Sequence, residues 1–161
     1  RPLARLLHAP VPRDDADGRH AEKLWVDGPG LAHDPFVSVE MLERGVHLPI
    51  MEGREVFKFA SVKMPESVAV ALQANKATPG DVKLLVPHQA NLRIIEAVAR
   101  NLGLPMEKVF VNIEEYGNTG AASIPLALHE ARQQERLGNG DLVLLTAFGA
   151  GLHWSAALVR F

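Results

Sequence analysis

Three short apolar runs alternate with amphipathic segments in the second half of this chain, and this alternation limits the folds that it can adopt. The runs at residues 82–86, 109–112 and 142–148 are short enough to be buried strands. Residues 90–102 and 121–134 carry apolar side chains at helical spacing. Strands that alternate with helices favour an α/β layer with a mostly parallel sheet.

Glycine and proline mark the ends of these elements and of a further helix. Gly103 stands where a helix C-terminus favours glycine. The tight turn at residues 149–151 makes residues 154–161 a closing strand, antiparallel to the strand before it. Residues 54–75 also have a helical pattern, but Pro65 interrupts it, so we expect a kink or two consecutive helices.

The first 50 residues differ from the rest of the chain. They contain six prolines and a polar stretch at residues 13–19, which predict long loops with short elements and one strand near residues 3–8. We therefore predict a single α/β unit over residues 1–161. Residues 1–50 supply an initial strand and loops, and residues 51–161 supply the core of a layered, mostly parallel, five-stranded mixed sheet with helices.

The composition argues against several classes of protein. Apolar residues make up 47% and charged residues 22% of the chain, and the net charge is −2, which suits neither a disordered chain nor a nucleic-acid-binding one. No apolar run of about 18 residues is present, so we expect no membrane span. Arg1 leads into no apolar segment, so we expect no signal peptide. The first residue is arginine and not methionine, so we interpret the chain as a fragment or a trimmed form of a longer protein. It contains no cysteine, and therefore no disulfide or thiol nucleophile.

A polar or glycine-rich loop follows each of the three predicted inner strands. The loops contain His88, Asn118 and the turn at residues 149–151. Ligands of open α/β sheets bind at the carboxyl ends of strands. An imidazole N–H, an amide NH₂ and a backbone N–H are all donors, and donors that converge can stabilise an oxyanion or an enolate. The imidazole can also transfer a proton near neutral pH.

Each of these features also has a purely structural explanation. A single histidine after a strand is commonly a structural or surface residue. Asn118 stands where a helix N-cap is expected, and residues 149–151 can be a simple hairpin turn. The residues alone leave both interpretations open. The remaining histidines show no metal-binding spacing, because HEARQ at positions 129–133 ends in glutamine where a zinc motif needs a second histidine.

Four segments resemble the β-ketoacyl-ACP synthase III family. VPHQANLRII at positions 86–95 resembles its histidine motif, and GNTGAASIP at positions 117–125 resembles its asparagine motif. GREVFK at 53–58 and AFGAG at 147–151 match in order and spacing. The resemblance is strong from about residue 52 onward and thin before it. It implies the C-terminal half of a thiolase fold, in which two similar α/β halves lie back to back.

This resemblance implies a cytoplasmic condensing enzyme of bacterial fatty-acid initiation that needs no cofactor. An acyl-CoA loads a cysteine, and malonyl-ACP then loses CO₂ and attacks the acyl thioester. His88 and Asn118 would hold the malonyl thioester oxygen, and the backbone N–H of Ala150 would help to hold the acyl oxyanion. The cysteine belongs to the first half, so we expect the isolated chain to be inactive.

The resemblance also assigns binding residues. Phe57 and Asn91 match positions that line the pantetheine channel, and a helix that began at His88 would place Asn91 on the same face. A basic patch that docks the acidic acyl carrier protein is implied for Lys58, Arg93 and Arg100, although scattered basic residues also form ordinary solvated faces.

The partners implied are the acyl carrier protein, the N-terminal half of the same enzyme and a second copy in a homodimer, with no nucleic acid and no membrane. Two other hypotheses stay open. One is a secondary-metabolism relative that transfers acyl groups to other acceptors, and the other is a non-catalytic scaffold or interaction half. His153 stands where we expect a smaller polar residue, and we interpret it as structural or partner-facing.

Overall fold

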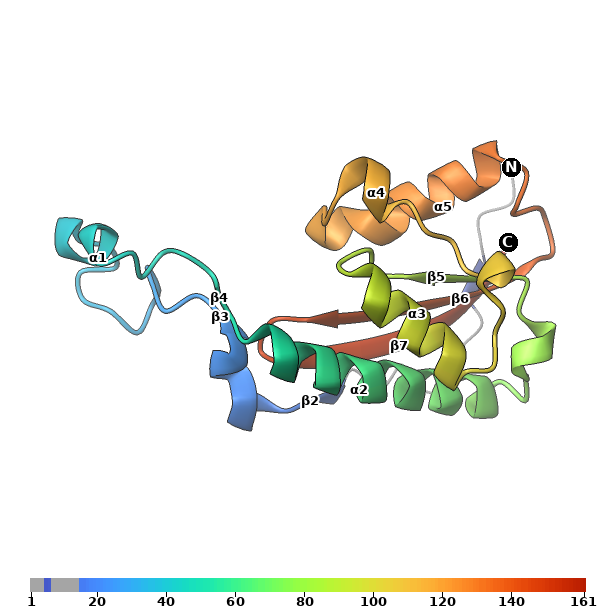
Figure 1. The fold of residues 1–161 in the computed structure, drawn as a ribbon, viewed down its shortest axis with the longest axis horizontal. Helices are drawn as coiled ribbons and strands as arrows, with labels where there is room; N and C mark the ends of the chain where they lie inside the picture. The colour runs from blue at the N-terminus through green and yellow to red at the C-terminus, as the bar shows by residue number, and fades with distance from the viewer. Residues whose placement is uncertain (1–4, 7–14) are drawn as a thin grey trace.

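The computed structural model describes residues 5–6 and 15–161, which form an α/β fold around a five-stranded mixed sheet (Figure 1). The strands lie in the order β1-β7-β6-β5, and β2 also pairs with β7. Their bounds are Arg5–Leu6 (β1), Asp15–Ala16 (β2), Leu84–Pro87 (β5), Leu142–Gly149 (β6) and His153–Arg160 (β7). The rest of the strand predicted near residues 3–8 lies outside the described residues.

Strands β6 and β7 form the hairpin at the centre of the sheet. They are antiparallel, and their last pair before the turn is Gly149 opposite His153. Gly151 in the turn has a φ of +74°, which glycine adopts without the steric cost that a side chain would bring. The predicted antiparallel closing strand is therefore confirmed.

The sheet is mixed, as predicted, but the prediction that it is mostly parallel is wrong. Residues 109–112 were expected to form a strand, yet they make only one parallel bridge, between Val109 and Leu85. A 3₁₀ turn at Met106–Lys108 precedes them and α4 (Ile113–Tyr116) follows, so too few extended residues remain for a ladder. Among the strands described, β5 and β6 are the one parallel pair.

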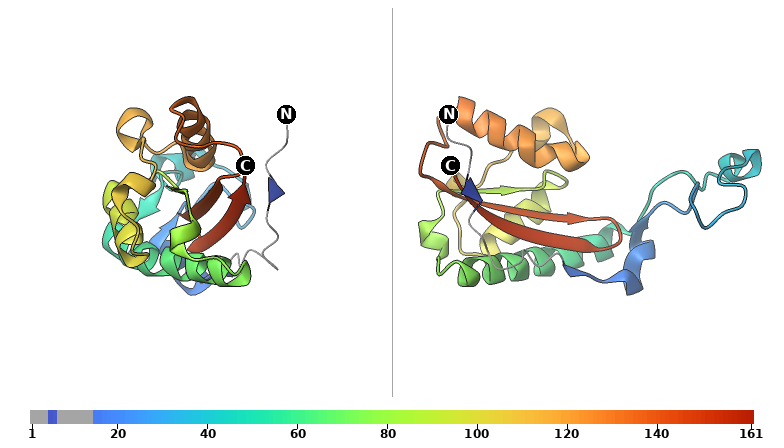
Figure 2. Two further views of the ribbon diagram at one scale, coloured as in Figure 1. Left: turned by 90° about the vertical axis from the view of Figure 1, so that its right-hand side faces the viewer. Right: turned by 180° about the vertical axis from the view of Figure 1, so that it is seen from behind.

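Helices cover both faces of the sheet (Figures 1 and 2). On one face lie α2 (Gly53–Ala74) and α3 (Leu92–Asn101), and on the other lies α5 (Ser123–Gln133). Side chains alternate across a strand, so Leu85 joins the core beneath α2 and α3 whereas Val86 joins the core beneath α5. No helix in the described part of the chain is both long and apolar enough to cross a bilayer.

Helix α2 continues through Pro65 as one helix, so of the two predicted alternatives, a kink or two consecutive helices, the second is wrong. Proline has no N–H and leaves the carbonyl four residues earlier without its helical donor. That carbonyl belongs to Ser61, and it accepts a hydrogen bond of 2.9 Å from Nδ2 of Asn101 on α3. A side chain of the neighbouring helix thus replaces the missing backbone donor.

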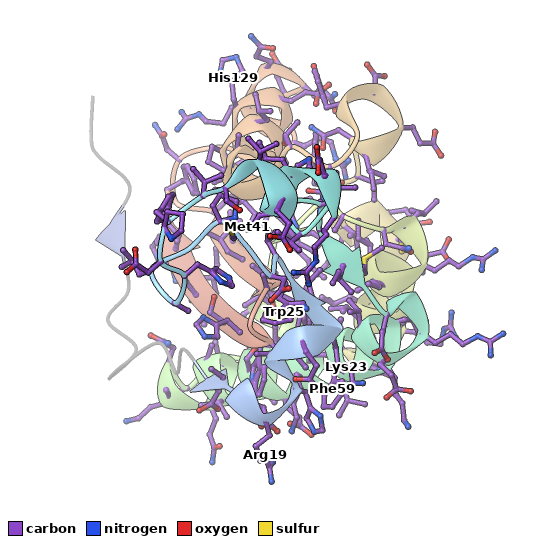
Figure 3. All side chains as sticks on the ribbon, turned by 90° about the vertical axis from the view of Figure 1, so that its left-hand side faces the viewer. Arg19, Lys23, Trp25, Met41, Phe59 and His129 are labelled. Atoms are coloured by element: carbon purple, nitrogen blue, oxygen red, sulfur yellow. The ribbon has the colours of Figure 1, made fainter. Side chains whose placement is uncertain are left out.

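Residues 26–49, which we call the arm, project from one end of the sheet (Figures 1 and 2). The arm contains the short helix α1 (Val39–Glu43), and its base is the antiparallel pair β3 (Leu24–Trp25) and β4 (Ile50–Met51). Figure 3 is viewed from the side on which the arm projects and shows Met41 on it, with Trp25 near its base. At its base, the carbonyl of Leu24 accepts the N–H of Gly151 in the turn after β6, so the arm starts beside the carboxyl end of β6.

Candidate functional site

A cavity of about 940 Å³ opens where β5 and β6 end. Its walls come from α2, from the loops after β5 and β6, and from the segment that leads into α5. Leu24 and Met51, at the base of the arm, also line it. Strand-end loops were predicted to hold the site, and five of the predicted site residues line this one cavity. They are His88, Asn118, Ala150, Phe57 and Asn91.

His88 directly follows β5 and is held at both its backbone and its ring. Its backbone N–H donates to the carbonyl of Thr146 on β6 at 2.8 Å, and its Nδ1 lies 2.6 Å from Oγ of Ser123. The ring is partly buried, and this burial lowers the pKa of His88 below its ordinary value. A neutral imidazole is therefore favoured at neutral pH, with Nε2 left for a ligand.

Asn118 lies in the loop between α4 and α5. Its Oδ1 accepts the backbone N–H of Gly120 at 3.0 Å, and this turn relies on Gly120 at a φ of +59°. The N-cap residue of α5 is Ala122, so the N-cap explanation of Asn118 does not hold for that helix. Because the amide oxygen is engaged, the NH₂ group is the part of the side chain available to a ligand.

The turn after β6 places Ala150 on the wall of the cavity. Gly151 N–H donates to the carbonyl of Leu24 at 3.2 Å, which ties the turn to the base of the arm. The N–H of exposed Ala150 makes no backbone hydrogen bond with any of residues 5–6 or 15–161. An unpaired N–H at the wall of a cavity can bind an anionic oxygen.

Phe57 and Asn91 lie on the cavity wall, but Asn91 does not lie within a helix that begins at His88, as the sequence suggested. Helix α3 begins at Leu92, and Asn91 is its N-cap residue, with Oδ1 accepting the N–H of Arg93 at 2.9 Å. His88 therefore precedes the helix, and the prediction that both side chains share a helical face is wrong. The loop after β5, rather than a helix, brings them to one wall.

The three predicted carrier-binding residues do not line the cavity. Lys58 is exposed on α2, and Arg93 and Arg100 are exposed on α3. Of the ion pairs formed between described residues, none involves these three side chains. Helices α2 and α3 are neighbours on the same face of the sheet, so the three positive charges belong to adjacent helices outside the cavity.

Sequence reasoning assigned no place in the site to three residues of this region, among them His153, which it interpreted as structural or partner-facing. Ser123 is the ring partner of His88, and His153 lines the cavity. Buried Gln89 donates from Nε2 to the carbonyl of Phe110 at 3.1 Å and accepts the N–H of Asn112 at 3.0 Å. Gln89 thus joins the end of β5 to the segment that leads to Asn118. Ser123 and Gln89 both fall inside the quoted motifs, but local spacing does not reveal their distant partners.

The arrangement suits the stabilisation of negative charge on oxygen. It combines an imidazole, an amide NH₂ and a backbone N–H at one cavity, and fixed donors of this kind lower the energy of an oxyanion. No cluster of three or more potential metal ligands occurs within the residues that the structure covers.

Comparison with known proteins gives a consistent result. Residues 72–161 match the family described as 3-oxoacyl-[acyl-carrier-protein (ACP)] synthase III C terminal. The chain is 50% identical over 146 residues to β-ketoacyl-[acyl-carrier-protein] synthase III of Roseiflexus sp. (strain RS-1), which covers 91% of this chain and 44% of the relative.

Solved structures agree with this match. The 3-oxoacyl-[acyl-carrier-protein] synthase III of Aquifex aeolicus VF5 has a TM-score of 0.83 and 42% identity, over 98% of this chain and 45% of its own. The corresponding Pseudomonas aeruginosa PAO1 protein has a TM-score of 0.83 and 39% identity, over 97% and 45%. The chain thus spans less than half the length of these relatives.

Proposed function

The chain belongs to the β-ketoacyl-ACP synthase III family, and on that premise we propose that it is the C-terminal catalytic half of an enzyme that condenses acyl-CoA with malonyl-ACP. Its fold is the thiolase-like α/β fold of that family. The observation that carries the proposal is the single cavity shared by His88, Asn118 and Ala150. Decarboxylative condensation passes through oxyanions, which such a donor set stabilises.

The first chemical step assigned to this half is decarboxylation. The bond between the malonyl carboxylate carbon and the α-carbon breaks, CO₂ leaves, and the electron pair moves into the thioester as an enolate. The imidazole of His88 and the NH₂ of Asn118 would hold the enolate oxygen. Because the donors are fixed by Ser123 and by the Gly120 turn, little reorganisation is needed as charge develops.

The second step forms the new carbon–carbon bond. The enolate carbon attacks the acyl thioester carbon, the carbonyl becomes a transient oxyanion held in part by the Ala150 N–H, and the enzyme thiolate leaves. This chain has no cysteine to carry the acyl group. We therefore assign the nucleophile to the N-terminal half of a complete, homodimeric, cytoplasmic enzyme. The two substrates supply the reacting groups, so no cofactor is assigned.

Two further surfaces follow from this assignment. Phe57 and Asn91, on the cavity wall, would contact the pantetheine of the substrates. The exposed charges of Lys58, Arg93 and Arg100 would attract the acidic carrier protein. None of these three side chains forms an ion pair with another described residue, which supports their availability. The donor set favours an enzyme over a non-catalytic scaffold, because a scaffold needs no such donors. A secondary-metabolism acyltransferase would have the same cavity but would transfer the acyl group to another acceptor.

The direct test supplies radiolabelled acetyl-CoA and malonyl-ACP to the purified chain and to the chain joined with the N-terminal half. We expect no β-ketoacyl-ACP above background from the chain alone, because it cannot form an acyl thioester. The joined protein should form product, and its Cys→Ala variant should not. Product from the chain alone, or none from the joined protein, would contradict the proposal. Transfer to another acceptor in place of malonyl-ACP would favour the secondary-metabolism alternative.

A further inference from the structure

Ser123 is a buried hydroxyl placed directly against the ring of His88. Its exposed fraction is 2%, and its Oγ lies 2.6 Å from Nδ1 of His88. Ser123 is the first residue of α5, and the hydrogen bonds of its hydroxyl to described residues are with His88 and Gln89, not with its own helix. The hydroxyl therefore does not cap its own helix. Its short contact with His88, 35 positions away, needs another explanation.

The direction of this hydrogen bond follows from the proton balance at Oγ. The backbone N–H of Gln89 points at the same oxygen at 3.4 Å and can only donate. Among the residues described, Nδ1 of His88 is the one acceptor within hydrogen-bond distance of the hydroxyl. If Nδ1 carried a proton, Oγ would face two donors, and its own buried proton would have no acceptor. An unmade buried hydrogen bond is costly.

We propose that Ser123 is a positioning residue that donates to Nδ1 and so fixes His88 as the tautomer with its proton on Nε2. This inference rests on the proposed function for its meaning, because it makes the cavity-facing nitrogen a donor before any proton transfer occurs. A His88 with its proton on Nδ1 would present a lone pair to the enolate oxygen and would repel it.

The fold holds both partners of this hydrogen bond on rigid elements. Ser123 begins α5, and the backbone of His88 extends the β5–β6 pairing through Thr146. Burial lowers the pKa of His88 and so favours the neutral ring at neutral pH, which is the form in which the two tautomers differ. Neither partner can move away without disturbing a helix start or the sheet.

The tautomer can be read without any enzymatic assay. Long-range ¹H–¹⁵N NMR spectra of the ¹⁵N-labelled 161-residue chain near pH 8 should show His88 with a protonated Nε2 and an unprotonated Nδ1. In Ser123→Ala, the ratio of the Nε2–H to the Nδ1–H tautomer should fall about tenfold, since one buried hydrogen bond is lost. Ser123→Thr keeps the hydroxyl and should keep the wild-type ratio.

A matched control is Ser67→Ala, which removes another buried serine hydroxyl, one that donates to the carbonyl of Met64 on α2 at 2.8 Å. This variant should leave the His88 signals unchanged. A wild-type spectrum with the proton on Nδ1 would overturn the inference at once, without reference to any variant. An unchanged tautomer ratio in Ser123→Ala would also overturn it.

Activity in the joined protein separates this inference from the proposed function. Ser123→Ala should slow malonyl decarboxylation about tenfold and spare acyl loading, and Ser123→Thr should restore the rate. If the spectra show the expected tautomer but His88→Ala keeps full decarboxylation, the proposed function fails and the structural inference stands. If His88→Ala abolishes decarboxylation but Ser123→Ala changes neither tautomer nor rate, only the inference about Ser123 fails.

Discussion

The arm and the body of this chain use apolar side chains in opposite ways. In the body, Leu85 is 0% exposed and lies between the central sheet and its helices, whereas Leu31 in the arm is 98% exposed. The arm is held by local polar bonds instead, such as Gly28 N–H to the carbonyl of Val46 at 3.0 Å. Residue type alone thus says little about burial, and the periodic pattern around a residue says more.

The body also contains every donor of the candidate site, while the arm contributes only its base to the cavity wall. In the joined protein, His88→Ala and Asn118→Ala should therefore each lower malonyl decarboxylation by about 10²–10³-fold, because each removes a fixed donor from the enolate. Acyl loading should be spared. The rates of CO₂ release and of acyl-enzyme formation measure the two steps.

The matched control for this prediction is His47→Ala, which removes an exposed histidine of the arm. It should leave both rates unchanged. Equal loss of loading and decarboxylation in His88→Ala would instead indicate a folding defect or another mechanism.

The difference in burial can be measured directly with two leucine truncations. Leu85→Ala should lower the free energy of unfolding by about 2–5 kcal/mol, because it leaves a cavity in the core. Leu31→Ala should change it by less than about 0.5 kcal/mol. Urea unfolding of both variants gives the comparison. A large loss in Leu31→Ala would mean that the arm side chain is buried in solution.

Charge on the body and on the arm should differ in its effect on the carrier protein. Arg93→Glu in the joined protein should weaken binding of the acidic carrier protein by about three- to tenfold at low salt, with less effect at high salt. Arg44→Glu reverses an exposed charge on the arm and should have no such effect. Binding curves at two salt concentrations would show this. Equal affinities for both variants would indicate that Arg93 is merely solvated.

Sequence patterns predicted the local part of the fold well. The segment expected at residues 90–102 is α3 (Leu92–Asn101), and Gly103 has the expected positive φ, at +64°. Apolar spacing within the segment encodes the helix, and the tolerance of glycine for a positive φ encodes its end, so no distant residue is needed. The strands that follow the same logic, β6 and β7, are also where the sequence put them.

The errors arose where distant residues decide the outcome. Helix α2 continues past Pro65 because Asn101, on another helix, supplies a donor to Ser61. The ring partner of His88 is Ser123, and no spacing rule relates two positions that meet only after the sheet and α5 assemble. The site residues were predicted from motifs that resemble those of a known family. The hydrogen bond that supports the ring of His88 joins positions far apart in the sequence, so no local pattern predicts it.

The smallest expected effect concerns the pH dependence of stability, which distinguishes the buried ring of His88 in the body from a solvated histidine. Burial places the pKa of His88 below its ordinary value of 6.5, so the unfolded chain binds a proton at His88 before the folded chain does. Stability should therefore fall as the pH decreases through 6.5 and level off below the folded pKa.

His88→Gln removes this contribution, so its urea midpoint should depend less on pH between about 7.5 and 5. The other histidines, including those of the arm, remain in both proteins and cancel in the difference. Parallel curves for the two proteins would mean that the ring is as solvated in the folded state as in the unfolded state, and that the neutral form is not favoured by the fold.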